Sequence, residues 1–186
     1  MMDEIRRLKR EVVSRGGITT YYKDTMRLPG GGIVFYDHVE HRGAAAIVPV
    51  RRDGRIVLVR QYRNSIERET WEIPAGGLNL LSDGSVEPTK QAAIRELKEE
   101  TGYETGDAEL LISIYSAPAY CNEKVDIYLA TGLHDPGAQH LDEEEYVEYR
   151  DFSLEELKEM IFQCKIQDSK TVAAILAYAD RIQEGK

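Results

Sequence analysis

Three carboxylates, Glu96, Glu99 and Glu100, lie within a stretch of five residues and suggest metal chemistry. On a helix, Glu96 and Glu100 would stack on one face as like charges. Near the C-terminal end of that helix they would also meet the negative end of the helix dipole, which disfavours each carboxylate by roughly 0.3–1 kcal/mol. Arg95 can bridge Glu99 at the i,i+4 spacing, but this leaves Glu96 and Glu100 without a cation nearby in the sequence. A divalent cation would remove the conflict, because carboxylate oxygens hold Mg²⁺ ions that are shared with substrate phosphates.

The helix that would carry these acids is predicted over residues 88–101. Most of its residues are good helix formers, Pro88 can occupy the first turn, where its missing N–H costs nothing, and Gly102 provides the stop signal. For an acidic run considered alone, a solvated acidic face is the simplest interpretation. The residues that surround this run favour a metal site instead.

The pattern from Gly76 to Tyr103 resembles the Nudix box of the Nudix hydrolases. That box reads Gly, five residues, Glu, seven residues, Arg-Glu-aliphatic, one residue, Glu-Glu, one residue, Gly and an aliphatic residue. Here seven residues separate Glu87 from Arg95, and Tyr103 stands at the aliphatic position. Ten residues, 77–86, lie between Gly76 and Glu87 where the pattern has five, and this insertion is either a surface turn or a segment that reshapes the mouth of the site. The matching positions of the second half are Arg95, Glu96, Leu97, Glu99, Glu100 and Gly102.

Segments outside the box are similar to those of the ADP-ribose and ADP-sugar pyrophosphatase branch of that family. They are QYR at residues 61–63, WEIPAGG at residues 71–77, IQDSKTVAAIL near the C-terminus, and Pro118, fifteen positions after Tyr103. A guanidinium group can bind phosphate oxygens through two hydrogen bonds, which suits a diphosphate substrate. The resemblance implies substrate contacts at Arg42, Arg63, Glu72 and Glu123. It implies metal ligands at Ala75 (through its carbonyl oxygen), Glu96, Glu99 and Glu100.

A second acidic run, residues 142–145, precedes a predicted strand. Acidic runs are most often solvated, but in the enzymes that this sequence resembles a glutamate from this loop assists the attack of water. We therefore expect a general base here, with Glu144 and Glu145 favoured over Glu143 because they lie nearest the strand. Glu123, in a shorter loop with Pro118, suits a fixed contact. Catalysis would then depend on Glu99, as a metal ligand, and on Glu144 or Glu145.

The elements that must position these residues follow from the hydrophobic pattern. Residues 1–41 form a predicted N-terminal β appendage of antiparallel strands, with turns at Gly16-Gly17 and at residues 29–32. Residues 42–186 form the main domain, in which the apolar runs at 44–50 and 55–63 are expected to be a central strand pair. Two C-terminal helices are predicted, one with a Ser153 and Glu156 capping box and one capped by Asp168 or Ser169. The predicted fold class is α/β, an α/β/α Nudix sandwich with a mixed central sheet.

Composition narrows the possible partners. The chain has 186 residues and a formal net charge of −9, which disfavours binding to nucleic acids or anionic membranes. No apolar run is long enough to span a membrane, and no signal peptide is evident, so we expect a cytoplasmic protein. Cys121 and Cys164 are expected to be reduced and structural.

The sequence thus predicts metal-dependent hydrolysis of a nucleoside diphosphate sugar, with ADP-ribose cleaved to AMP and ribose 5-phosphate as the leading case. The expected cofactor is Mg²⁺, with Mn²⁺ as an alternative, and the resemblance implies a homodimer that uses the N-terminal strands. Other nucleotide sugars, such as ADP-glucose or GDP-mannose, remain alternatives, because no residue identifies the base or the sugar. A Nudix-fold module that binds ADP-ribose without cleaving it is an alternative from a different class.

Overall fold

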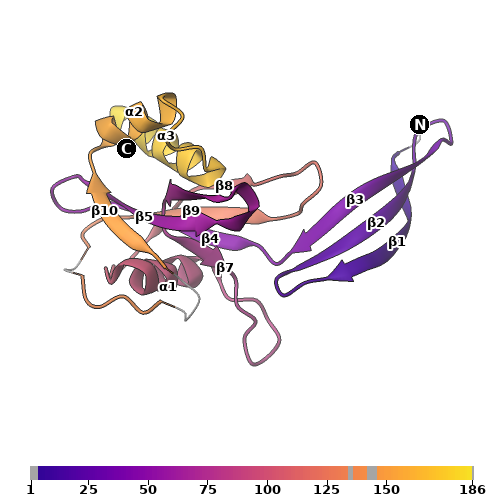
Figure 1. Cartoon of the computed structure of the whole chain (residues 1–186), viewed down its shortest axis with the longest axis horizontal. Helices are drawn as coiled ribbons and strands as arrows, with labels where there is room; N and C mark the ends of the chain where they lie inside the picture. The colour runs from indigo at the N-terminus through magenta and orange to yellow at the C-terminus, as the bar shows by residue number, and fades with distance from the viewer. Residues whose placement is uncertain (1–3, 134–135, 142–145, 186) are drawn as a thin grey trace. The chain divides into compact units, whose positions relative to one another are not determined.

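A computed structural model describes residues 4–133, 136–141 and 146–185 of the chain (Figure 1). The chain divides into two compact units. The first unit comprises residues 1–43 and a second segment, residues 115–124, which the sequence pattern does not mark as part of it. The second unit comprises residues 44–114 and 125–186 and holds all of the helices in the described part of the chain.

The first unit is built on a three-stranded antiparallel sheet in the order β1-β2-β3. Its strands are β1 (Arg6–Arg15), β2 (Thr19–Arg27) and β3 (Ile33–His41). The turn between β2 and β3 needs positive φ angles, 86° at Gly30 and 91° at Gly31, which glycine adopts without steric cost. The buried Asp24 accepts two hydrogen bonds from the guanidinium of Arg10, at 2.7 and 2.6 Å.

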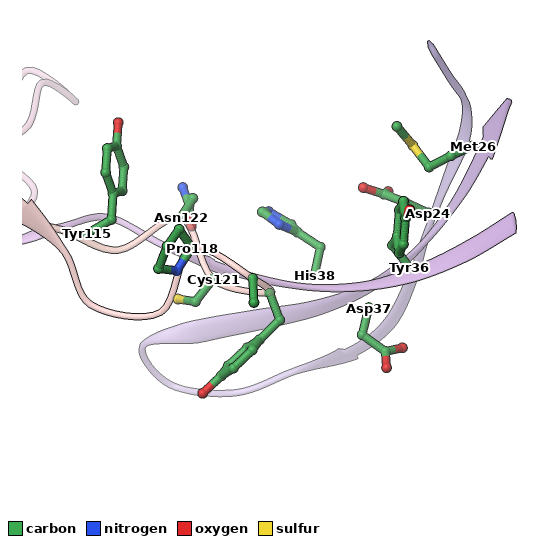
Figure 2. A pocket seen from close by; sticks show the side chains of 11 residues that line it. Asp24, Met26, Tyr36, Asp37, His38, Tyr115, Pro118, Cys121 and Asn122 are labelled. Atoms are coloured by element: carbon green, nitrogen blue, oxygen red, sulfur yellow. The ribbon is translucent and has the colours of Figure 1, made fainter. Parts of the chain in front are cut away.

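The segment 115–124 is hydrogen-bonded along β3. The Val39 N–H donates to the Tyr120 carbonyl at 2.7 Å, and the His41 N–H donates to the side-chain oxygen of Asn122 at 2.7 Å. A cavity of about 400 Å³ lies between this segment and strands β2 and β3. Figure 2 shows Pro118 and Asn122 on one side of this cavity and His38 on β3. The loop that carries Pro118 is therefore part of the first unit.

The second unit contains two sheets. The mixed sheet has the order β7-β4-β9-β8, in which β4 runs parallel to β9 and antiparallel to β7. The other sheet has the order β10-β5-β6 and is antiparallel. A short 3₁₀ helix, Asn64–Ile66, connects β5 to β6. The strands are β4 (Ala44–Pro49), β5 (Ile56–Arg63), β6 (Arg68–Glu72), β7 (Ala75–Gly77), β8 (Glu109–Tyr115), β9 (Lys124–Ala130) and β10 (Glu148–Phe152).

The expected pairing of the two central apolar runs is wrong. Strands β4 and β5 lie in different sheets, and only an isolated bridge between Val50 and Ile56 joins them next to their connecting turn. Every residue of β4 is buried, so its sequence carries no alternation that could distinguish one neighbouring strand from another. The choice of β9 and β7 as its neighbours is made by the packing of the whole unit.

Helices cover both sides of the strands and give the predicted α/β/α layers (Figure 1). Helix α1 (Thr89–Thr101) packs in one apolar cluster with Ala45 and Ile47 of β4. Helices α2 (Leu154–Phe162) and α3 (Ser169–Gln183) pack in another cluster with Ala46 and Val48 of the same strand. Alternate residues of β4 thus point toward opposite helical layers. None of the described helices is long and apolar enough to cross a membrane.

The helix caps agree with the sequence patterns. Ser153 and Glu156 form the predicted capping box at the start of α2. At the start of α3, the Asp168 carboxylate accepts the Thr171 N–H at 3.0 Å. This cap places Lys170 and Thr171 in the first turn of α3.

Candidate active site

Helix α1 presents its acids at its C-terminal end, as the sequence predicts. The helix ends at Gly102, which has a φ of 72° and donates its N–H to the Lys98 carbonyl at 2.9 Å. Glu96 is 8% exposed and Glu100 is 3% exposed, whereas Glu99 is half-buried. Two like-charged carboxylates are therefore held largely away from water at the negative end of a helix. Such an arrangement is unfavourable for folding alone and is typical of a functional site.

The backbone of strand β7, at Ala75 and Gly76, lies against these two carboxylates. The Ala75 N–H donates to Oε2 of Glu100 at 3.2 Å. At Gly76, an added Cβ would lie 2.0 Å from Oε1 of Glu96, much closer than real Cβ atoms approach another atom. The absence of a side chain at Gly76 therefore makes room for the Glu96 carboxylate. This explains in physical terms why the motif begins with glycine.

Arg95 bridges three acids of the motif, Glu87, Glu96 and Glu99. Its Nη1 donates to Glu96 at 2.7 Å and to Glu99 at 2.8 Å, and its Nε and Nη2 donate to Glu87 at 3.0 and 2.9 Å. The hydrogen bonds to Glu87, together with the charge of Glu96 and the hydrogen bonds to Glu99 and Glu96, raise the pKa of Arg95 against the opposing effect of burial. The expectation that Glu96 lacks a cation near it in sequence is therefore wrong. The reason is that the Arg95 side chain reaches the adjacent residue as well as the one four positions on.

The inserted segment folds back on itself and returns Glu87 to the helix. The Leu81 N–H donates to the Ser85 carbonyl at 2.9 Å, and Leu80 and Val86 form an isolated antiparallel bridge. At the base of this small hairpin, the Glu87 N–H donates to the Asn79 carbonyl at 2.9 Å. The extra residues are thus accommodated in a turn, while Glu87 still meets Arg95.

Arg63 and Glu72 form a second charged cluster. Nε and Nη2 of Arg63 donate to the two oxygens of Glu72, at 2.7 and 2.5 Å. The Glu72 carboxylate also accepts from the Thr70 hydroxyl and from the Lys170 ammonium group. Burial alone would raise the pKa of Glu72, but the hydrogen bonds from Arg63 and the charge of Lys170 outweigh it and lower the pKa to about 2.

The two clusters belong to one region of the second unit. Only Ile73 and Pro74 separate Glu72 from Ala75 in the chain. The carboxylate of Glu100 is also near enough to Arg63 to contribute to the raised pKa of that guanidinium, after the larger effect of its hydrogen bonds to Glu72. The buried carboxylate of Glu100 and the Arg63 guanidinium therefore lie within electrostatic reach of each other.

Residues 136–141 cover the C-terminal end of α1. The His140 N–H donates to the Glu99 carbonyl at 2.9 Å, and the side-chain amide of Gln139 donates to the Glu100 carbonyl. These donors satisfy carbonyl groups that a helix end leaves without intrahelical partners. They connect the residues that precede the acidic run 142–145 to the helix that carries the acids.

Two of the expected substrate contacts, Arg42 and Glu123, belong to the first unit. Arg42 is exposed. Oε1 of Glu123 lies 3.5 Å from Nδ1 of His41, but this nitrogen already accepts the Gly43 N–H at 3.1 Å. A nitrogen that accepts a hydrogen bond cannot also donate one, so we do not assign a hydrogen bond between His41 and Glu123.

The expected general bases Glu144 and Glu145 lie outside the described residues. Within residues 4–133, 136–141 and 146–185, no three His, Cys, Asp or Glu side chains are already grouped to hold a metal ion. Nη1 of Arg95 donates to Oε1 of Glu96 and to Oε2 of Glu99, so one oxygen of each carboxylate is held by this guanidinium. Sequence reasoning also missed Lys170, because nothing in its local pattern links it to Glu72, 98 positions away.

Comparison with known proteins identifies the family to which the chain is similar. A sequence model described as the NUDIX domain matches residues 40–174. The chain is 37% identical over 173 residues to a methanol dehydrogenase activator of Bacillus methanolicus, covering 92% of this chain and 91% of that protein. It is 38% identical over 170 residues to an ADP-ribose pyrophosphatase of Mycobacterium tuberculosis, covering 90% of this chain and 79% of that protein. It is 32% identical over 173 residues to an ADP-ribose pyrophosphatase of Bacillus subtilis, covering 92% of this chain and 91% of that protein.

A crystal structure of an ADP compounds hydrolase shares the fold, with a TM-score of 0.83 at 23% identity, over 100% of this chain and 97% of the other. The family match covers most of the chain, and the three relatives match it over 79–91% of their own length. These comparisons favour an enzyme over the alternative of a non-catalytic binding module. The chain therefore belongs to the Nudix family and is a Nudix hydrolase that acts on the diphosphate of a small nucleotide substrate.

Proposed function

We propose that this enzyme hydrolyses ADP-ribose to AMP and ribose 5-phosphate with the help of a divalent metal, Mg²⁺ or Mn²⁺. The observation that carries the proposal is the buried pair Glu96 and Glu100: Gly76 leaves room for the Glu96 carboxylate, and Glu100 lies within electrostatic reach of Arg63. This pairing of acids and a guanidinium suits a diphosphate that is bound together with a cation. Two of the relatives are named ADP-ribose pyrophosphatase, which favours ADP-ribose among the nucleotide sugars.

The donor set fits a divalent cation of this kind. Glu96, Glu99 and Glu100 supply carboxylate oxygens, the ligands that Mg²⁺ and Mn²⁺ prefer, and the Ala75 carbonyl is the proposed fourth protein ligand. Nudix hydrolases are generally dependent on divalent metals. When bound, the cation would lower the pKa of a water molecule and neutralise charge on the diphosphate. The chain's own contribution is to hold the acids in place, through the room that Gly76 leaves for Glu96 and the hydrogen bonds from Arg95 to Glu96 and Glu99.

In the proposed reaction, water attacks one phosphorus atom of the diphosphate and the bond from that atom to the bridging oxygen breaks. Arg63 would bind non-bridging phosphate oxygens through the edge of its guanidinium that Glu72 does not occupy. The attacking water loses its proton to a carboxylate, for which we propose Glu144 or Glu145. The contacts of Gln139 and His140 with the end of α1 support this assignment, because they anchor the chain just before these residues at the acidic helix.

Arg42 and Glu123 remain proposed substrate contacts. A diphosphate that binds between acidic residues benefits from each additional guanidinium, since the net charge of the chain is −9. Glu123 suits a hydroxyl group of a sugar, because an ionised carboxylate only accepts hydrogen bonds.

We also propose a homodimer that uses the sheet of the first unit. A three-stranded sheet exposes edges and is marginal by itself, so a second copy that covers it would add stability. Its strands expose large apolar side chains, among them Phe35 at 62% exposure. Light scattering should give about twice the chain mass of 21.1 kDa over a wide concentration range, and a mass that stays at that of one chain would contradict the proposal.

A hydrolysis panel tests the function directly. ADP-ribose, ADP-glucose, GDP-mannose and other ADP compounds are incubated with the enzyme and Mg²⁺, Mn²⁺ or excess chelator, and the products are identified by chromatography. We expect AMP and ribose 5-phosphate from ADP-ribose at the highest kcat/KM, and no turnover in chelator. Preferred cleavage of another nucleotide sugar would contradict the proposed substrate. Undiminished turnover in chelator would contradict the proposed metal.

A further inference from the structure

The carboxylate of Glu72 is fully occupied by donors from its own chain. Oε1 accepts from Nε of Arg63 and from the Thr70 hydroxyl, and Oε2 accepts from Nη2 of Arg63 and from Nζ of Lys170. An ionised carboxylate offers about four lone-pair sites, and here four donors fill them. Glu72 is also only 1% exposed. A substrate group could reach this carboxylate only by displacing one of these partners, so the contacts describe a support for Arg63 rather than a substrate contact.

Among these donors, Lys170 is far from Glu72 in the sequence, at a separation of 98 positions. It lies in the first turn of α3, where its ammonium group contacts Glu72 and also the carboxylate of Asp168 at 3.0 Å. With Arg63, the cluster contains two cations and two anions. Removal of the Lys170 charge would leave the buried Glu72 with a single cationic partner, which is costly in a poorly solvated position.

The same turn of α3 also holds the backbone that leads to the acidic site. The Ile73 N–H donates to the buried Thr171 hydroxyl at 2.9 Å, and that hydroxyl donates to Asp168 at 2.6 Å. Two residues further on, Ala75 and Gly76 contact the acids of α1. The segment 72–76 is thus fixed by α3 at one end and by α1 at the other.

We propose that Lys170 is a positioning residue for the reaction. Its ammonium group holds the Glu72 carboxylate, and this carboxylate fixes one edge of the Arg63 guanidinium. The other edge of the guanidinium then faces the substrate diphosphate. The Arg63 side chain is 38% exposed, whereas that of Lys170 is 13% exposed, so Arg63 is the cation that a ligand can reach. This inference rests on the proposed function, because it takes Arg63 to be the residue that binds phosphate.

The test compares Lys170→Met with Arg181→Met, which removes a cation from the far end of the same helix, where it pairs with Glu109 at 2.6 Å. We expect Lys170→Met to lower kcat/KM for ADP-ribose by about 10- to 100-fold, mainly through KM, because misplacement of a binding group by about 1 Å has effects of this size. The control should stay within about twofold, as for other exposed ion pairs. Lys170→Arg should recover part of the loss, since it restores the charge.

A double-mutant cycle separates this role from a general loss of structure. In an Arg63→Met background, Lys170→Met should change kcat/KM by less than about twofold, because its effect would pass through the missing guanidinium. The dissociation constant of ADP-ribose in excess chelator should follow the same pattern and does not depend on turnover. If Lys170→Met does not fold, Lys170→Gln, which keeps a hydrogen-bond donor, takes its place in the cycle.

If the losses in kcat/KM caused by Lys170→Met and by Arg63→Met multiply in the double variant, the proposal is overturned. It is also overturned if the kcat/KM of Lys170→Met equals that of the Arg181→Met control. If the wild-type enzyme cleaves another compound of the panel and not ADP-ribose, the proposed substrate fails, and the cycle with the compound that is cleaved still decides the role of Lys170. A non-multiplying cycle, with the same pattern in ligand affinity, would support the inference.

Discussion

Substitution of Gly76 by alanine tests whether the position of the Glu96 carboxylate limits the reaction. The added methyl group would lie 2.0 Å from Oε1, 2.2 Å from Cδ and 2.6 Å from Oε2 of Glu96, whereas real Cβ atoms stay at least 3.0 Å away. The carboxylate must therefore move by about 1 Å, the difference between 3.0 and 2.0 Å. That movement also disturbs its 2.7 Å hydrogen bond from Arg95.

We expect a larger effect on activity than on stability. A displacement of about 1 Å in a catalytic group can cost about 10²-fold in rate, so kcat/KM should fall by about that factor. The free energy of unfolding should fall by no more than about 1–3 kcal/mol, the usual cost of overpacking. The end of a long side chain can move more easily than backbone, and alanine also lowers the entropy of the unfolded chain. The concentration of Mg²⁺ that gives half-maximal activity should rise in parallel.

The adjacent Gly77 supplies a matched control, because a Cβ at that position would meet nothing within 4 Å. Steady-state kinetics at several Mg²⁺ concentrations, together with urea unfolding, are measured for Gly76→Ala and Gly77→Ala. Gly77→Ala should retain nearly full activity. If the two variants have the same kcat/KM, the contact between Gly76 and Glu96 does not control the site and the reasoning is refuted.

Further predictions concern the acids. Glu100→Gln should remove most of the turnover. The free energy of unfolding without metal should be unchanged or higher, because the substitution relieves both the repulsion from Glu96 and the unfavourable interaction with the helix dipole. Full activity in this variant would contradict the assignment of Glu100 as a metal ligand. A second test compares Glu→Gln substitutions at position 123 and at positions 143–145. We expect the substitution at position 144 or 145 to lower kcat by about 10²–10⁴-fold. A loss of activity only at position 123 would show that the general base is misassigned. The pKa of Glu72 is lowered to about 2 in the folded protein, whereas it is about 4.3 in the unfolded chain. The ionised carboxylate therefore contributes roughly 3 kcal/mol to the free energy of unfolding at pH values above about 4.3, and this contribution is lost as the pH falls from about 4.3 to about 2. Glu72→Gln should therefore flatten the acid side of the urea-midpoint profile, and a profile as steep as that of the wild type would contradict this pKa.

Local sequence was sufficient for the elements whose formation depends on near neighbours. The helix that ends at Gly102, the capping box of Ser153 and the three strands of the first unit follow from propensities, turn residues and caps. The neighbours of β4 do not follow in this way, because a strand that is buried on both faces has no polar alternation to indicate its partners. The place of residues 115–124 in the first unit is likewise set by hydrogen bonds to β3, far away in sequence.

For the site, the sequence by itself determined which carboxylates share one helical face, because the i,i+4 spacing is a property of any helix. Only the tertiary structure decided how they are held: Gly76 makes room for Glu96, and the Ala75 N–H binds Glu100 across 25 positions. Likewise, the sequence indicated Arg63 and Glu72 as candidate residues, but their mutual hydrogen bonds and the link to Lys170 arise only when β5, β6 and α3 pack together. Helical periodicity acts over a few residues, whereas the burial of a charge requires partners from wherever the fold brings them, and no local pattern encodes that choice.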